Sequence, residues 1–356
     1  TRFRSDWSSD VCSSDLASNL PDALLLVAFG GPEGPEDVTP FLQNVTAGRD
    51  VPADRLAEVE QRYLSRGGKS PGNDRMRALL AGVQTEVERR GLDLPVVWGN
   101  RNWHPFIEEA VTDLEQRGLH RVAAWFSSPN RSYSTCRQYL EQISAATENS
   151  SVTVERLRPH YDHPGCIEPA ADRLREALSS LPGEHQADAC LLFSAHSLPL
   201  ASADTCAYFD EIHEAARLIA ERVSPHGQHR WEVVWQSRSG SPHVPWLTPD
   251  VGDRIDELAE QGVQAVAVSP VGFPVGNFEV EWDLDVEAAQ RAAAHGMSFA
   301  RANTIDQDPR FAAMIVDLLL ERFTPGASPA ALGTLGIAPD VCPGTCCPPP
   351  PQRPPT

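Results

Sequence analysis

Short apolar runs that are rich in β-branched residues alternate along the chain with longer segments of helical periodicity. In the first half, the apolar runs are ALLLVAFG, PVVWGN and RVAAWFSS, and each is followed by an amphipathic segment. The second half repeats this order with ACLLFSAHS, WEVVWQSRSG and VQAVAVSPVGF. An alternation of strands and helices is typical of parallel sheets with crossover helices. The pattern therefore predicts an α/β protein with two doubly wound, Rossmann-like lobes, each built on a parallel sheet.

The same pattern indicates where one lobe ends and the next begins. We expect the boundary near residues 154–163, and a return of the chain to the first lobe in the last predicted helix. From Thr324 the sequence is rich in Pro, Gly and Ala and ends in PPPPQRPPT, a composition that cannot continue a helix. The predicted segments are a first lobe at 21–158, a second lobe at 159–307, a returning helix at 308–323 and an extended tail at 324–356.

Composition and charge exclude several classes of protein. The formal net charge of −19, without any block of Lys and Arg, argues against a nucleic-acid partner. The longest apolar stretches, 23–29 and 263–271, are far shorter than the roughly 20 residues that cross a bilayer. Residues 1–20 are polar, unlike a secretory signal, and we expect them to be disordered or foreign to the natural protein. We therefore expect a monomeric protein of the cytoplasm with no transmembrane segment.

Two ionisable residues follow apolar strands, at the edge where a parallel sheet binds its ligands. His196 ends the strand in SAHSLP, and Glu279 follows VQAVAVSPVGF in the next unit. A desolvated imidazole stays neutral near pH 7 and accepts a proton. Each residue alone also has a structural explanation, His196 as a hydrogen-bonded core histidine and Glu279 as a first-turn charge that the helix dipole favours.

The segments around these two residues, together with two segments of the first half, resemble the ferrochelatase family. In chain order they read LLLVAFGGPEGPEDVTPFLQNV, RYLSRGGKSPGNDRMRALL, SAHSLP, WQSRSGSPHVPWLTPD and GFPVGNFEVEWDLDVEA, and the resemblance covers residues 23–323. It implies a metal chelatase of haem biosynthesis in which a His and a Glu face each other across a porphyrin. His196 would then bind the metal and take a proton, Glu279 would bind the metal and relay protons, and ferrous iron would be a substrate.

The resemblance also implies contacts to the porphyrin. Propionates need cationic or hydrogen-bonding partners, and the corresponding positions are Arg49 in TAGRD and Ser70 in GGKSP. Asn130 stands where relatives commonly place a porphyrin-contacting Tyr, and we expect the neighbouring Arg131 to grip a propionate instead. Arg101 is a further candidate for this role.

Three cysteines crowd into the tail segment VCPGTCCPPP, and thiolates on a short segment favour a metal site. The segment resembles the actinobacterial branch of the family, in which such cysteines and one internal cysteine hold a 2Fe-2S cluster. The resemblance implies Cys342, Cys346 and Cys347 as ligands, with Cys166 in HPGC as the internal candidate. Structural zinc would use the same four ligands. The cysteines expected to be inert buried thiols are Cys136, Cys190 and Cys206.

The resemblance to this branch implies coproporphyrin III as the substrate, with protoporphyrin IX as the other candidate. Gly276 and Asn277 stand where the family usually has Asp-His, and Phe29 stands where some relatives carry a metal-ligating Tyr. These departures keep a second hypothesis open, a degenerate homologue that binds porphyrin or haem without turnover. A cobalt chelatase of corrin synthesis and a zinc-stabilised interaction module are the remaining alternatives.

Overall fold

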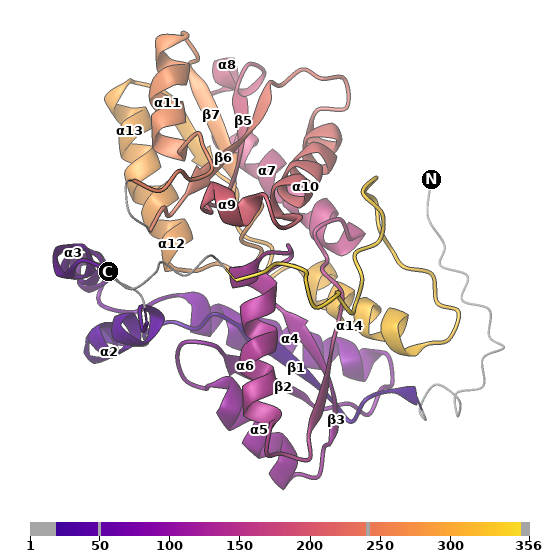
Figure 1. Ribbon diagram of the computed structural model, residues 1–356. Coiled ribbons are helices and arrows are strands. Elements are labelled where there is room, and N and C mark those ends of the chain that lie inside the picture. The colour runs from indigo at the N-terminus through magenta and orange to yellow at the C-terminus, as the bar shows by residue number, and fades with distance from the viewer. Residues whose placement is uncertain (1–18, 49–50, 240–242, 350–356) are drawn as a thin grey trace.

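The computed structural model describes residues 19–48, 51–239 and 243–349 and shows two lobes, each built around a four-stranded parallel sheet (Figure 1). This arrangement confirms the predicted fold class, whereas the residue boundaries of the lobes remain predictions. The expectations for residues 1–18 and for Arg49 lie outside the described residues. None of the helices in the described part of the chain combines the length and the hydropathy that a bilayer span requires.

The first sheet has β1 at its centre, and all six residues of this strand are buried. Burial on both faces explains why ALLLVA shows no alternation of apolar and polar residues. The strands, in spatial order, are β2 (Val96–Asn100), β1 (Ala23–Ala28), β3 (Arg121–Phe126) and β4 (Thr153–Arg156). The helices of this part of the chain are α2 (Pro35–Val45), α3 (Ala53–Ser65), α4 (Gly72–Arg89), α5 (Ile107–Gln116), the π-helix η1 (Tyr133–Arg137) and α6 (Gln138–Thr147).

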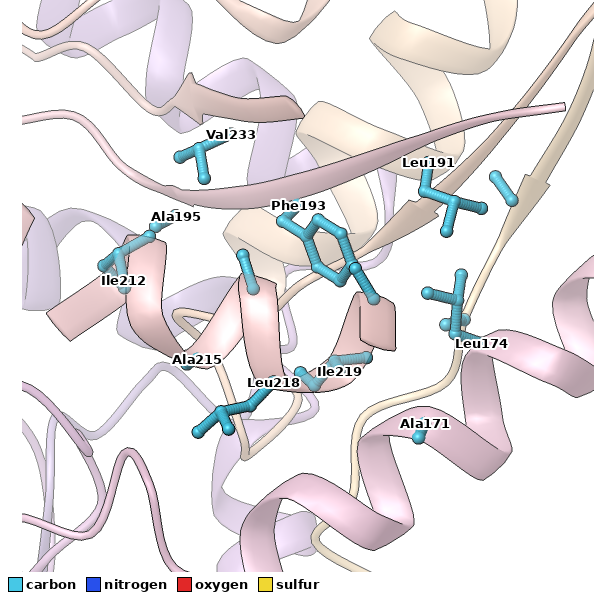
Figure 2. Packing of buried hydrophobic residues seen from close by; sticks show 14 of the residues in the cluster. Ala171, Leu174, Leu191, Phe193, Ala195, Ile212, Ala215, Leu218, Ile219 and Val233 are labelled. Atoms are coloured by element: carbon cyan, nitrogen blue, oxygen red, sulfur yellow. The ribbon is translucent and has the colours of Figure 1, made fainter. Parts of the chain in front are cut away.

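The second sheet repeats the topology of the first. Its inner strand β5 pairs in parallel with both neighbours, β6 and β7. Its strands, in spatial order, are β6 (Trp231–Gln236), β5 (Cys190–His196), β7 (Ala265–Ser269) and β8 (Ser298–Arg301). The helices are α7 (Pro164–Ser180), α8 (Gly183–Gln186), α9 (Leu200–Ala203), α10 (Tyr208–Val223), α11 (Val251–Glu260), α12 (Phe278–Val280), the π-helix η2 (Glu281–Ala288) and α13 (Ala289–Ala294). Figure 2 shows how Leu174 of α7, Phe193 of β5 and Ile219 of α10 pack together on one face of this sheet.

The last helix, α14 (Pro309–Phe323), returns to the first lobe. Phe311 and Ile315 of α14 are fully buried in the same apolar cluster as Leu24 of β1 and Met76 of α4. The first core is therefore built from both ends of the described chain.

Beyond α14, the described part of the tail is an extended segment that contacts both lobes. The backbone N–H of Leu332 donates to the Asp162 carbonyl at 3.0 Å, in the crossover between the lobes. The Thr334 N–H and hydroxyl both donate to Glu214 of α10. The extended conformation agrees with the Pro-rich composition, and the contacts fix the tail across the two lobes (Figure 1).

Candidate active site

His196 and Glu279 meet at the carboxyl edge of the second sheet. His196 is the last residue of β5, and Glu279 lies in the short helix α12 that follows β7. The His196 Nε2 and Glu279 Oε2 atoms are 4.0 Å apart, and the two side chains are 30% and 45% exposed. The sequence analysis placed both residues at strand ends, and the structure brings them together.

Hydrogen bonds fix the orientation of the imidazole. His196 Nδ1 lies 2.6 Å from the Ser197 carbonyl oxygen, and because a carbonyl only accepts, Nδ1 carries the proton. In the neutral form of the ring, Nε2 then carries the lone pair, on the side of Glu279. The Tyr208 hydroxyl donates to the His196 carbonyl at 3.0 Å and holds the strand end in place.

The distance between His196 and Glu279 decides what the pair can do. A separation of 4.0 Å is too long for a direct hydrogen bond. Bonds from a transition metal to imidazole nitrogen and carboxylate oxygen are each about 2.0–2.2 Å long. One metal ion therefore fits between the two groups, whereas direct proton transfer between them requires a closer approach.

Asn277 positions Glu279. Its side-chain oxygen accepts a hydrogen bond from the Val280 N–H at 3.0 Å and so forms the N-cap of α12. The preceding Gly276 donates its N–H to Asp306 at 3.4 Å. A side chain at Gly276 would lie 3.1 Å from Thr304 Oγ1, tighter than normal contacts. The Gly-Asn pair that departs from the family pattern therefore has a structural role here.

Asp283, one turn after Glu279, is a site residue that the sequence analysis missed. Its carboxylate accepts hydrogen bonds from Ser237, directly after β6, and from Gln236 Nε2 at 3.3 Å. Burial raises the pKa of Asp283 to about 6, although the Ser237 hydrogen bond opposes the rise, and the charge of Glu279 adds to it. Its four-residue spacing from Glu279 was the available signal. A carboxyl group with this pKa exchanges protons near neutral pH.

Aromatic side chains from both lobes lie beside Glu279. Tyr63 of α3 stacks on Phe278 of α12, with ring centroids 3.8 Å apart and an interplanar angle of 14°. Phe278 stacks in turn on Trp282, at 6.0 Å. Burial raises the pKa of Tyr63, and the charge of Glu279 raises it further, so the phenol stays neutral. Tyr63 and Phe278 are both buried, so the stacked rings pack α12, the helix that carries Glu279, against α3 of the first lobe.

The predicted porphyrin contacts lie in different surroundings. Ser70 is buried, donates its N–H to the Pro32 carbonyl, and accepts the Gly72 N–H on its hydroxyl. Asn130 is also buried, and its side-chain amide has no hydrogen-bond partner among the described residues. Ser70 therefore acts here as a loop support, and the contact of either residue with a porphyrin remains a prediction.

Arg131 links the two lobes. Its Nε donates to Glu211 Oε1 at 2.5 Å and its backbone N–H donates to Glu211 Oε2 at 2.7 Å. Glu211 belongs to α10 and is completely buried, and burial raises its pKa to about 7 against the opposing effect of Arg131. The structure thus uses Arg131 in a buried ion pair, and the predicted propionate contact would have to use the rest of its guanidinium group.

The tail cysteines lie near Cys136 of η1, and one of them also contacts Arg156 at the end of β4. The Cys346 and Cys347 sulfurs are 3.5 Å apart. Arg156 donates to the sulfur of Cys136 and, at 3.7 Å, to that of Cys342. Burial raises the pKa of Cys136 to about 11; Arg156 opposes this rise, and the nearby Cys342 and Cys346 add to it. Cys136, which the sequence analysis took for an inert thiol, therefore belongs to this group.

Cys166 lies elsewhere. It is buried in the apolar cluster that includes Met314 of α14, and burial raises its pKa to about 12, with Asp162 as the neighbouring charge. The structure does not bring Cys166 to the tail cysteines, because α7 turns its thiol toward the core of the first lobe. Within residues 19–48, 51–239 and 243–349, no three His, Cys, Asp or Glu side chains are already arranged to hold a metal ion.

The chain is similar in sequence to known proteins over most of its length. Residues 21–323 match the sequence profile of the family described as Ferrochelatase. The coproporphyrin III ferrochelatase of Streptomyces griseus is 44% identical over 358 aligned positions, which span 94% of this chain and 96% of that protein. The coproporphyrin III ferrochelatase of Frankia alni is 47% identical, over 94% of this chain and 88% of that protein.

The fold also resembles a smaller chelatase. The structure of SirB from Bacillus subtilis with Fe³⁺ superimposes with a TM-score of 0.52 at 12% identity, over 86% of this chain and 96% of that one. Its cobalt complex gives a TM-score of 0.51 at 11% identity, over 85% of this chain and 96% of that one. At these identities the similarity concerns the fold alone.

Proposed function

The chain belongs to the ferrochelatase family, and we propose that it inserts ferrous iron into coproporphyrin III during haem biosynthesis. The observation that carries this proposal is the pair of His196 and Glu279, which leaves room for one metal ion between an imidazole nitrogen and a carboxyl oxygen. We infer the substrate from the names of relatives that are 44–47% identical to this chain over nearly its whole length.

Iron insertion releases the two pyrrole N–H protons of the porphyrin, so the site needs a base and a route for protons. His196 Nε2 carries the free lone pair and takes the first proton. Glu279, which faces Nε2 at 4.0 Å, accepts protons from the imidazole when the two side chains approach to hydrogen-bond distance. Asp283, with its pKa raised to about 6 by burial, receives them next and passes them to solvent. His196 and Glu279 then act both as metal ligands and as proton carriers.

The test is an anaerobic incubation of the purified protein with ferrous iron and either coproporphyrin III or protoporphyrin IX. Loss of free-porphyrin fluorescence reports metallation. We expect faster metallation of coproporphyrin III than of protoporphyrin IX. Tight binding of porphyrin without metallation would refute the proposal and favour a porphyrin-binding homologue. Cobalt outcompeting iron would favour the cobalt chelatase.

We also propose that Cys136, Cys342, Cys346 and Cys347 hold a 2Fe-2S cluster, which needs four thiolates. Cys136 replaces Cys166 in this ligand set, because Arg156 contacts both Cys136 and the tail. The buried Nε of Arg156, which has no hydrogen-bond partner among the described residues, fits a site built for an anionic group. When bound, the cluster supplies one-electron chemistry and connects the tail to η1.

A pair of matched variants tests the ligand set. Cys136→Ser should remove the visible absorbance of the cluster and its acid-labile sulfide, whereas Cys166→Ser should keep both. Because both thiols are buried, the Cys166 variant controls for the loss of stability that any buried Cys→Ser substitution brings. Loss of the absorbance in the Cys166 variant alone would restore the original assignment, and stoichiometric zinc without sulfide would replace the cluster by a structural zinc ion.

A further inference from the structure

Arg156 joins the two parts of the cysteine group. It ends β4, and its side chain reaches Cys136 of η1 on one side and the tail on the other. Nη2 donates to the Pro339 carbonyl at 2.8 Å and lies 3.7 Å from the Cys342 sulfur. The residue is only 7% exposed. A single buried guanidinium group therefore contacts both sources of the proposed cluster ligands.

The charge of this guanidinium group needs an explanation. Arginine stays protonated in proteins, and a buried charge is normally paired, because an unpaired one costs several kcal/mol. Across the described ranges, the contacts of the Arg156 guanidinium are two sulfurs and one carbonyl, with no carboxylate oxygen within 4.0 Å. Its Nε has no hydrogen-bond partner there either. The described surroundings thus place neutral acceptors and thiols in direct contact with the guanidinium, and the Asp340 carboxylate acts on it only from beyond ion-pair distance.

Arg158 shows the usual arrangement two residues further along the chain. It is also buried, at 2% exposed, and it also donates to a tail carbonyl, that of Ala330, at 2.9 Å. Its charge, however, is balanced by Glu321 at 2.5 Å and by Asp162 at 3.7 Å. The fold therefore provides carboxylates where a buried arginine only fixes the tail. Arg156, by contrast, faces sulfur.

We infer that Arg156 is a positioning residue whose buried charge balances the thiolates of a cysteine-bound iron–sulfur cluster and sets its reduction potential. The inference rests on the proposed cluster. Two ferric ions, two sulfides and four thiolates carry a double negative charge, and one electron from a reductant makes it triple without forming or breaking a bond. Charge and hydrogen bonds to sulfur set the potential of such clusters. A nearby cation stabilises the more negative, reduced state and raises the potential.

The experiment is a mediated redox titration of the full-length protein with its cluster, followed by visible absorbance and EPR. Three variants are compared with the wild type: Arg156→Met, Arg156→Lys and Arg158→Met. At a fixed potential we expect Arg156→Met to lower the ratio of reduced to oxidised cluster about tenfold, which is about 59 mV in midpoint for a one-electron couple. Arg156→Lys keeps the charge, so its midpoint potential should lie between those of the wild type and Arg156→Met. Arg158→Met should leave the midpoint unchanged although it also loosens the tail.

The possible results distinguish the role of Arg156 from the presence of the cluster. Equal midpoints for wild type and both Arg156 variants would overturn it, as would an equal change in Arg158→Met. If Arg156→Met folds but loses its cluster while Arg158→Met keeps it, the charge-balancing role is supported, and Arg156→Lys provides the potential. A wild-type protein without iron and sulfide would overturn the cluster proposal together with this inference. Iron insertion, measured separately with coproporphyrin III, tests the proposed activity independently of both.

Discussion

Replacement of Asp283 by Asn should make the protein more stable at neutral pH and less active. Asp283 is buried beside Glu279, and burial raises its pKa from the ordinary 3.8 to about 6. The folded state therefore binds its proton more tightly than the unfolded state does. Between these two values the stability falls as the pH rises, because ionisation favours the unfolded chain. The difference corresponds to about 3 kcal/mol, at roughly 1.4 kcal/mol for each tenfold in proton affinity.

The neutral Asn avoids this cost, since its amide oxygen can still accept from Ser237. We expect Asp283→Asn to gain about 3 kcal/mol in the free energy of unfolding at pH 7.5 and only about 1 kcal/mol at pH 4.5. Urea unfolding at both pH values measures the difference. Low protein concentration is needed at the lower pH, which lies near the isoelectric point of about 4.9. Iron insertion should slow by about tenfold or more, because the carboxylate no longer accepts protons.

Asp285 offers a matched control on the same π-helix. It pairs with Arg301 at 2.5 Å and is partly exposed, so Asp285→Asn should cost about 1 kcal/mol or less and bring no stabilisation at pH 7.5. A gain for Asp283→Asn that is the same at both pH values would refute the reasoning, because it would show that the ionised carboxylate is not the source of the cost. Unchanged iron insertion would remove Asp283 from the proton route.

Three further substitutions test other parts of the structure. His196→Ala should slow iron insertion at least 100-fold while porphyrin quenching of tryptophan fluorescence persists; unchanged turnover would contradict its role as base. Arg131→Met leaves the buried Glu211 without its ion-pair partner and should lower the free energy of unfolding, measured in urea, by about 3 kcal/mol. A loss under about 1 kcal/mol would show that the ion pair is dispensable. Leu174→Ala (Figure 2) should cost about 2–5 kcal/mol, checked by the same assay.

The fold and the central pair could be predicted from the sequence because both depend on local patterns. Strands and helices alternate visibly, and the edge at which a parallel sheet binds ligands follows from strand direction, so His196 and Glu279 could be placed at strand ends. In the sequence, Asn277 stands out only as a departure from the family pattern, although Asn is also a favoured N-cap residue. The structure shows that it caps the helix of Glu279.

The cysteine group could not be predicted in the same way. Arg156 and Pro339 are 183 positions apart in sequence, and their contact depends on how the tail crosses the lobes. Nothing local distinguishes Cys136 from Cys166, since both precede or begin helices and both are buried. Asp283 was missed for a related reason: its raised pKa depends on burial and on Glu279, which only the folded chain provides.

The return of α14 to the first lobe has a consequence for the order in which the protein is made. Strand β1 is synthesised well before α14, yet its apolar face is covered in part by Phe311 and Ile315 of that helix. Domains fold as units during synthesis when their sequence is complete. Here the lobe that is translated first is completed last, and until then the growing chain must carry an unfinished apolar core.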